Sequence, residues 1–301
     1  MIRSLRFAVG GLAAVITGVA GAQGFGPDAV RTEQVGDGLY VLFTEAPGII
    51  AGNLLISVGE DGVLLVDDGV PDAVPAYKAA VEQLGGSGIT MVINTHWHFD
   101  HADGNQVLGP EGVLIMAHEN SRQMMMRDNL INLVAQTMEQ PAYDESAWPD
   151  MTYDSQMFVR FNGERIDLLH SGPAHTTGDT AVILRNNNLA HLGDVFNTSG
   201  YPFIDADNGG SLAGVIAFCE MVLDELDPGA IVIPGHGGVS DYQGLADYAA
   251  MLSTIHDRIA AMIEDGMSLE QVIAAEPTAE WDDARGSPAM LIDRAYASMT
   301  R

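Results

Sequence analysis

The chain has 301 residues with 41 acidic and 13 basic side chains, so its formal net charge is −28. A surface of this charge repels nucleic acid and anionic membranes, which we therefore exclude as partners. The single cysteine, Cys219, cannot form an intramolecular disulfide, and its apolar neighbours indicate a small buried side chain.

The N-terminus is typical of a secretory signal peptide. Arg3 and Arg6 supply the positive region, residues 7–19 form a short apolar core, and residues 20–22 (Ala-Gly-Ala) form a small-residue cleavage site. The alternative is a membrane anchor, but the apolar stretch is shorter than the ~20 residues that a spanning helix needs. We expect removal of residues 1–22 and a periplasmic or secreted protein, with no membrane partner after cleavage.

The first half of the remaining chain alternates strand-like and helix-like segments. Apolar runs bounded by turn residues predict strands at residues 38–44, 53–58, 63–67, 89–93 and 113–116. Helical patterns cover residues 71–84 and begin again at His118 or Glu119. The apolar side chains that follow are typical of adaptable core: Met124, Met125, Met126, Leu130 and Leu133.

A compact group of metal-ligand side chains follows the strand that ends at Ile93. His96, His98, Asp100 and His101 form an H-x-H-x-D-H motif. Burying unpaired imidazoles and a carboxylate in a core is costly. A divalent ion would satisfy them, because neutral imidazole suits zinc and similar ions and a carboxylate adds charge. The motif therefore predicts a metal site at the end of this strand.

The second half repeats the pattern of strands followed by helices. Strands are predicted at residues 166–170, 181–184, 189–192 and 231–233. Helices are predicted at residues 211–226, 240–264, 268–275 and 288–299. Between the halves, residues 136–160 lack clear periodicity, and we interpret them as an insertion that forms a wall of the pocket. Alternating strands and helices in two strand-rich halves predict an α/β layered fold.

Three further candidate ligands lie next to strand-like runs in this half. His175 lies in a Gly/Pro-rich turn, Asp194 follows the run 189–192, and His236 follows Pro-Gly after the run 231–233. Side chains at strand ends can be held rigidly while one edge of the sheet stays open to a substrate. We interpret the remaining histidines as structural: His118, His170, His191 and His256.

With these motifs the chain resembles the metallo-β-lactamase superfamily of hydrolases over almost all of residues 23–301. The resemblance implies one hydrolase domain with an α/β fold, a four-layer αββα sandwich that carries two divalent metal ions at one edge. It implies that the ligands of the first ion are His96, His98 and His175, and those of the second Asp100, His101 and His236. Asp194 would bridge the two. Zinc is the expected metal, although such ligands also accept iron or manganese.

Two positions separate the chain from the best-known β-lactamase subclass, which has Cys where Asp194 stands and Arg where His101 stands. A second lactamase subclass shares the His101-type ligand but lacks an acidic bridge, and an Asp bridge is more usual in the thioesterase and lactonase branches. We expect a dinuclear metal-dependent hydrolase with β-lactamase activity. The alternative is a lactonase or another ester or thioester hydrolase, and a non-catalytic metal-binding protein is the third interpretation.

Asp100 and three further side chains are expected to serve this reaction on a small-molecule substrate. Asp100 is the expected catalytic residue, which orients the attacking water and accepts its proton. Asp67 is expected to hold the non-ligating nitrogen of a metal-bound histidine. Asn197 and Tyr201, which follow Asp194, are expected to donate hydrogen bonds to the substrate, although neutral donors are weaker than a charged one.

Overall fold

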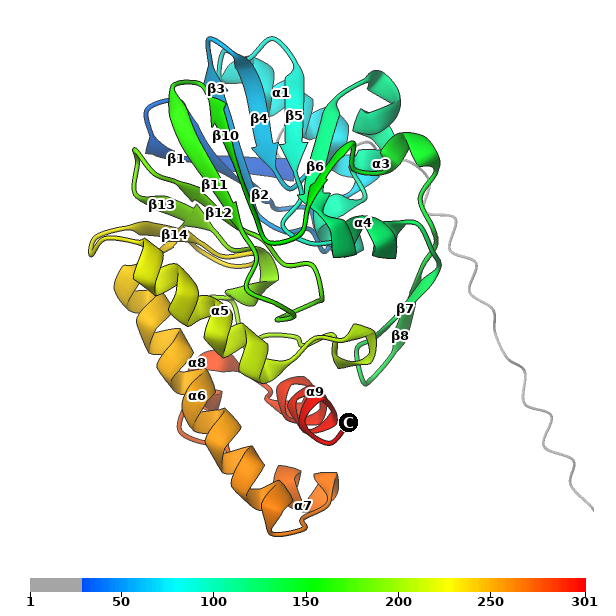
Figure 1. Cartoon of the computed structure of the whole chain (residues 1–301), viewed down its shortest axis with the longest axis vertical. Coiled ribbons are helices and arrows are strands. Elements are labelled where there is room, and N and C mark those ends of the chain that lie inside the picture. The colour runs from blue at the N-terminus through cyan, green and yellow to red at the C-terminus, as the bar shows by residue number, and fades with distance from the viewer. Residues whose placement is uncertain (1–28) are drawn as a thin grey trace, which may run out of the picture.

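The protein is a sandwich of two facing β-sheets with helices on both outer faces (Figure 1). The computed structural model describes residues 29–301. The expected signal peptide, residues 1–22, lies outside the described residues. The layers confirm the predicted four-layer αββα fold.

The first sheet contains seven strands in the order β1-β2-β3-β4-β5-β6-β9. Neighbours from β1 to β4 are antiparallel, and β4, β5, β6 and β9 are parallel. The bounds of these strands are β1 (Val30–Gly36), β2 (Leu39–Thr44), β3 (Leu54–Gly59), β4 (Gly62–Val66), β5 (Ile89–Ile93), β6 (Leu114–His118) and β9 (Met151–Tyr153). The helices of this half are α1 (Val74–Gln83), α2 (Phe99–Ala102), α3 (Asn105–Leu108) and α4 (Glu119–Met125).

The second sheet has the order β10-β11-β12-β13-β14-β15 and is antiparallel except for the parallel pair β13 and β14. Its strands are β10 (Gln156–Phe161), β11 (Glu164–Leu169), β12 (Ala181–Leu184), β13 (Leu189–His191), β14 (Ile231–Ile233) and β15 (Ser240–Asp241). The helices of this half are α5 (Leu212–Glu225), α6 (Tyr242–Glu264), α7 (Leu269–Ala274), α8 (Asp282–Arg285) and α9 (Ala289–Met299). None of the helices within residues 29–301 combines the length and apolar character that a bilayer span requires.

The strands β4 and β12 carry no polar side chain because both of their faces are buried. In β4, Leu64 and Val66 pack between the two sheets, whereas Val63 and Leu65 pack against α1 on the outer face. Successive side chains of a strand point to opposite faces, so a continuous apolar run fills two core layers. Burial on both faces fixes the register of the strand, and with it the position of the residues that follow its end.

The interpretation of residues 136–160 as an insertion without regular structure was wrong. The segment holds β9, which extends the first sheet, and β10, which forms an edge of the second. It also holds β8 (Thr137–Gln140), which pairs with β7 (Asn129–Asn132) in a hairpin outside the two sheets. These strands lie at the edges of the main sheets or outside them, so they lack the apolar runs of the central strands. The edge strand β1 was missed for the same reason.

The methionine-rich stretch is only partly core. Met124 and Met125 are buried in a cluster with Trp97, but Met126 is 40% exposed and Leu130 is 58% exposed. The helix α4 ends at Met125, and the chain then enters β7, which turns Leu130 away from the core. His118 caps α4 by accepting a hydrogen bond from the Asn120 amide, in keeping with its predicted structural role at the helix start.

Candidate metal centre

Three strand ends bring the candidate ligands to one edge of the sandwich. His96 and His98 follow β5, Asp194 follows β13, and His236 follows β14, which runs parallel to β13. The carboxyl ends of parallel strands meet at one edge of a sheet, which is where open α/β folds bind ligands. His175 reaches the same edge from the loop between β11 and β12, and Asp100 and His101 lie in the short helix α2.

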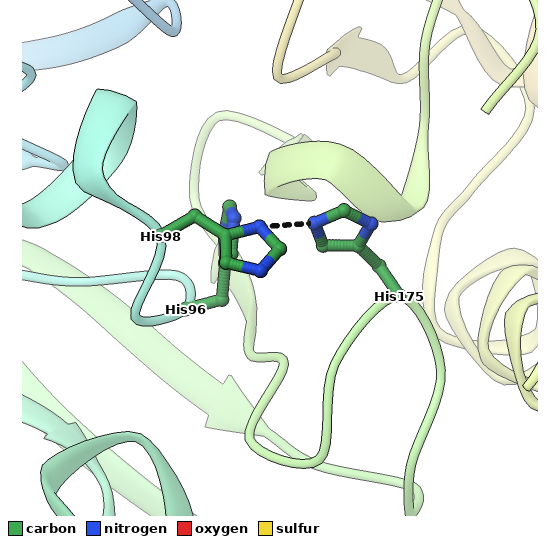
Figure 2. Close-up of side chains that lie close together, drawn as sticks. All are labelled: His96, His98 and His175. Atoms are coloured by element: carbon green, nitrogen blue, oxygen red, sulfur yellow. Dashed lines mark hydrogen bonds between the residues drawn. The ribbon is translucent and has the colours of Figure 1, made fainter. Parts of the chain in front are cut away.

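The first ligand set consists of His96, His98 and His175, whose rings converge in the buried interior (Figure 2). One nitrogen from each ring lies within 4.8 Å of the others. The closest pair is His98 Nδ1 and His175 Nε2, which are 2.9 Å apart.

The hydrogen bonds of these rings show which nitrogens carry protons. The Nδ1 of His175 lies 2.8 Å from the carbonyl oxygen of Phe203, which can only accept, so Nδ1 must donate. The Nε2 of His98 lies 3.0 Å from the carboxylate of Asp205, so this nitrogen donates as well. In neutral rings, the two nitrogens that face each other then both present lone pairs.

This arrangement fits a cation. Two lone pairs at 2.9 Å repel each other unless a positive group lies between or beside them. His96 Nε2 points into the same space, is buried, and has no hydrogen-bond partner among the described residues. Three imidazole nitrogens converging in this way match the donor set of a divalent transition metal such as zinc.

The second ligand set combines Asp100, His101, Asp194 and His236, whose ligand atoms also lie within 4.8 Å of one another. His236 Nε2 is 3.1 Å from Asp100 Oδ2 and 3.3 Å from Asp194 Oδ1. His101 Nε2 is 3.0 Å from the same oxygen of Asp194. This set contains two carboxylates, which the first set lacks.

Asp194 connects the two sets. Its Oδ1 contacts His101 and His236, and its Oδ2 lies 3.7 Å from Nε2 of His175, a member of the first set. One carboxylate therefore directs one oxygen toward each set.

Asp67 lies behind His101, as expected of a residue that orients a ligand. Its Oδ2 accepts a hydrogen bond of 2.7 Å from His101 Nδ1. Thr95 donates to both oxygens of the same carboxylate, through its amide at 2.6 Å and its hydroxyl at 2.8 Å. These bonds direct the Nε2 of His101 toward the second set.

Asp205 plays the corresponding part for His98 and was missed in the sequence. It is buried, its Oδ2 accepts from His98 Nε2, and Asn208 donates to both of its oxygens. It lies far from the histidine motif in a segment without periodicity. The only signal was a single acidic residue between the apolar Ile204 and Ala206.

The two residues expected to contact substrate are engaged in contacts within the chain. Asn197 forms a bridge with His236 through its backbone, and its side-chain oxygen accepts hydrogen bonds from Ser199. The Tyr201 hydroxyl donates to Asp282 at 2.8 Å and lies 3.3 Å from the carbonyl oxygen of Thr278. These contacts give no support to substrate binding by the Tyr201 hydroxyl.

The family model of the metallo-β-lactamase superfamily matches residues 51–240, which include every member of the two ligand sets. The chain belongs to this superfamily. It is thus related to metal-dependent hydrolases, and it carries the histidine and aspartate clusters that could hold their metal ions.

Several solved structures share the fold of this chain. The lactamase DIM-1 superposes with a TM-score of 0.57 at 18% identity over 75% of this chain and 97% of that one. The metallo-β-lactamase of Pontibacter korlensis superposes with a TM-score of 0.60 at 16% identity. The match covers 74% of this chain and 99% of that one. A variant of the sec-alkyl sulfatase PisA1 superposes with a TM-score of 0.68 at 14% identity over 90% of this chain and 50% of that one.

A curated relative is similar over a shorter stretch. The alpha subunit of 2,4-dinitroanisole O-demethylase from Nocardioides sp. (strain JS1661) is 25% identical over 143 residues. The match covers 46% of this chain and 40% of the subunit, so the chain spans less than half the length of that protein.

The protonation of this superfamily site differs between the two ligand sets. Burial lowers the pKa of His96 well below its usual value, and burial together with neighbouring His98 lowers the pKa of His175. Burial also opposes the charged form of His236, but Asp194 and Asp100 outweigh it and raise the pKa to about 10. Burial likewise opposes the charged form of His101, but the same carboxylates, with Asp67, outweigh burial and raise the pKa well above its usual value.

We therefore predict two zinc equivalents per chain with different pH dependence. At neutral pH His96 and His175 are unprotonated and ready to ligate, whereas His101 and His236 must first release protons. Affinity for the second ion should rise about tenfold per pH unit for each displaced proton until the pH approaches about 10, the pKa of His236. Zinc titrations at mildly acidic and mildly alkaline pH measure this. A plateau at one equivalent, or equal pH dependence of both ions, would contradict it.

We predict that Asp205→Asn weakens zinc binding by the first set about 10- to 100-fold, the range seen when a partner of a ligating histidine is replaced. An amide accepts a weaker hydrogen bond than a carboxylate and no longer fixes the His98 ring with the same strength. Chelator competition measures the affinity. Asp150→Asn is the control, because Asp150 binds the Ile115 amide away from the ligands. Equal zinc affinity in the two variants would refute the role of Asp205.

Proposed function

We propose that the chain is a dinuclear metal-dependent hydrolase of small-molecule acyl substrates. The observation that carries the proposal is the position of Asp194, whose two oxygens lie toward different ligand sets. A non-catalytic metal-binding protein would need neither a shared carboxylate nor a second, carboxylate-containing set beside the first. Two divalent ions, for which zinc is our expectation, would supply Lewis acidity and lower the pKa of a water molecule.

Asp100 is the group that we assign to the proton transfer. Burial raises the pKa of Asp100, but His101 and His236 outweigh burial and hold the pKa below its usual value. The carboxylate is therefore ionised at neutral pH and can accept a hydrogen bond from an attacking water. Its Oδ2 lies 3.1 Å from His236 Nε2, which fixes its orientation within the second set.

Neutral lactones and esters are the substrates that the surrounding contacts favour. The carboxylate of a β-lactam is best held by a charged donor. The sequence contains one lysine, Lys78, which pairs with Glu111 on the outer helix α1. Arg285 donates to the carbonyls of Asn197 and Gly200, and the Tyr201 hydroxyl is bound to Asp282. These three donors are thus engaged within the chain, which favours a substrate that has no carboxylate to be held.

Opening of β-lactam rings is the second candidate. The fold likeness to DIM-1 and to the Pontibacter korlensis enzyme supports it, since both are named as metallo-β-lactamases. The Asp194 bridge and the relatives named as a sec-alkyl sulfatase and an O-demethylase weigh toward C–O or S–O bonds instead. Export of the protein, which the N-terminal residues predict, would bring the enzyme into contact with either class of substrate outside the cytoplasm.

A hydrolysis panel on zinc-loaded protein distinguishes the candidates. We predict faster turnover of acyl-homoserine lactones and simple esters than of penicillins, cephalosporins or carbapenems, because the lactones lack a carboxylate. A chelator should abolish the activity and added zinc should restore it. Faster turnover of any β-lactam would make β-lactam opening the main activity. A loaded protein that hydrolyses none of these substrates would contradict the proposal as a whole.

We further predict that Asp100→Asn lowers turnover by about 10²–10⁴-fold, the range for a positioned acid–base group. The substitution preserves shape but removes the proton acceptor. The matched control is Asp103→Asn in the same region, because Asp103 binds the Tyr143 hydroxyl and belongs to neither ligand set. Both variants are assayed at equal zinc content. Normal turnover in loaded Asp100→Asn would remove this residue from the mechanism.

A further inference from the structure

One loop contacts residues of both ligand sets. Residues 196–209 connect Asp194 to α5, and we call them the backing loop. The amide of Thr198 donates to the His236 carbonyl at 3.0 Å, and the backbone of Asn197 pairs with His236. Farther along the loop, the Phe203 carbonyl accepts from His175, and Asp205 accepts from His98. Its first part therefore supports the second set, and its later part supports the first set.

The opposite side of the backing loop is held by the C-terminal helices. Arg285, the last residue of α8, donates from Nη1 to the carbonyls of Asn197 at 2.9 Å and Gly200 at 3.3 Å. Asp282, in the same helix, accepts from the Tyr201 hydroxyl at 2.8 Å. These contacts hold the part of the loop that pairs with His236.

A second arginine holds the later part of the backing loop. Arg294 of α9 is only 8% exposed, and its Nη1 donates to Asp207 Oδ2 at 2.8 Å. Arg301 donates to the other oxygen of Asp207 at 2.8 Å. Asp207 and Asp205 lie in one short turn, because the 3₁₀ helix at residues 206–208 begins directly after Asp205. Arg294 thus acts on the turn that carries the partner of His98.

We propose that Arg285 and Arg294 are positioning residues for the metal ligands, with Arg285 acting on His236 and Arg294 acting on His98 and His175. The proposal rests on the dinuclear site proposed above. Both arginines lie in the helices α8 and α9 (Figure 1), beyond the matched residues 51–240, whereas every member of the two ligand sets lies within those residues. A loop of this length without strand or long helix needs such external contacts to keep one conformation.

The test compares Arg285→Ala and Arg294→Ala with the control Arg185→Ala. Arg185 makes a similar set of bonds, to Asp167 and Glu225, at a distance from the backing loop. Zinc affinities for the first and second equivalents are measured by chelator competition. We expect Arg294→Ala to weaken by about tenfold the same equivalent that Asp205→Asn weakens. Arg285→Ala should weaken by about tenfold the equivalent that His236→Ala removes.

A second readout needs no metal. The ring N–H protons of His98 and His175 are buried in hydrogen bonds, so their exchange with water is slow and can be followed by NMR in the metal-free chain. We expect about tenfold faster exchange in Arg294→Ala, unchanged exchange in Arg185→Ala, and partial recovery in Arg294→Lys, which keeps one donor. Where an alanine variant does not fold, Arg285→Lys and Arg294→Lys supply the comparison, with smaller losses expected in the same zinc equivalents.

The proposal is overturned if both arginine variants keep the ring exchange and both zinc affinities of the unmodified chain. It is also overturned if Arg185→Ala, at equal thermal stability, loses zinc affinity to the same extent. If neither the unmodified chain nor any variant binds zinc, only the proposed dinuclear function is contradicted. Ring exchange would still decide whether Arg294 positions His98 and His175.

Discussion

The convergence of imidazole lone pairs and carboxylate oxygens at one sheet edge is the constraint on which the rest of the structure depends. Side chains of this kind destabilise a buried site when nothing neutralises them. In the metal-free chain, protons on His101 and His236 neutralise the carboxylates of Asp100 and Asp194. The first set has no acidic member, so its lone pairs face each other directly. The fold must therefore hold this set in place against repulsion.

The sandwich meets this requirement by surrounding the ligands closely with backbone. A Cβ atom added to Gly235 would lie 2.0 Å from Asp194 Oδ1, and one added to Gly52 would lie 2.1 Å from Cε1 of His101. Neither position leaves space for any side chain. The backbone segments next to the ligands thus leave these side chains no room to move apart. The buried strands on both sides fix the position of these segments.

The sequence was most informative where chemistry and secondary structure are both local. The H-x-H-x-D-H motif directly follows an apolar strand, so its residue types and its position could be read together. His175, Asp194 and His236 were recognisable because each stands in a turn next to a strand-like run, and the superfamily resemblance indicated how they group. The sandwich followed from the same alternation of buried strands and helices.

The remaining features depend on contacts between distant segments, which leave little local signal. Asp205 supports His98 across 107 residues of sequence, and nothing in its own neighbourhood distinguishes it from an ordinary turn residue. Tyr201 was assigned to the substrate because it follows Asp194, but its hydroxyl is bound to Asp282 of α8. The strands β9 and β10 acquire their identity only from their neighbours in the two sheets.

The charge of the whole molecule connects the site to its substrates. A net charge of −28 draws divalent cations toward the surface and disfavours the approach of anions. Metal uptake by the second set benefits from this field, whereas a substrate with a free carboxylate must approach against it. Bound cations can reverse the local potential only within a short range, because salt screens charges over ~10 Å. A neutral ester or lactone meets no such barrier, so the surface and the contacts around the metal centre favour the same class of substrate.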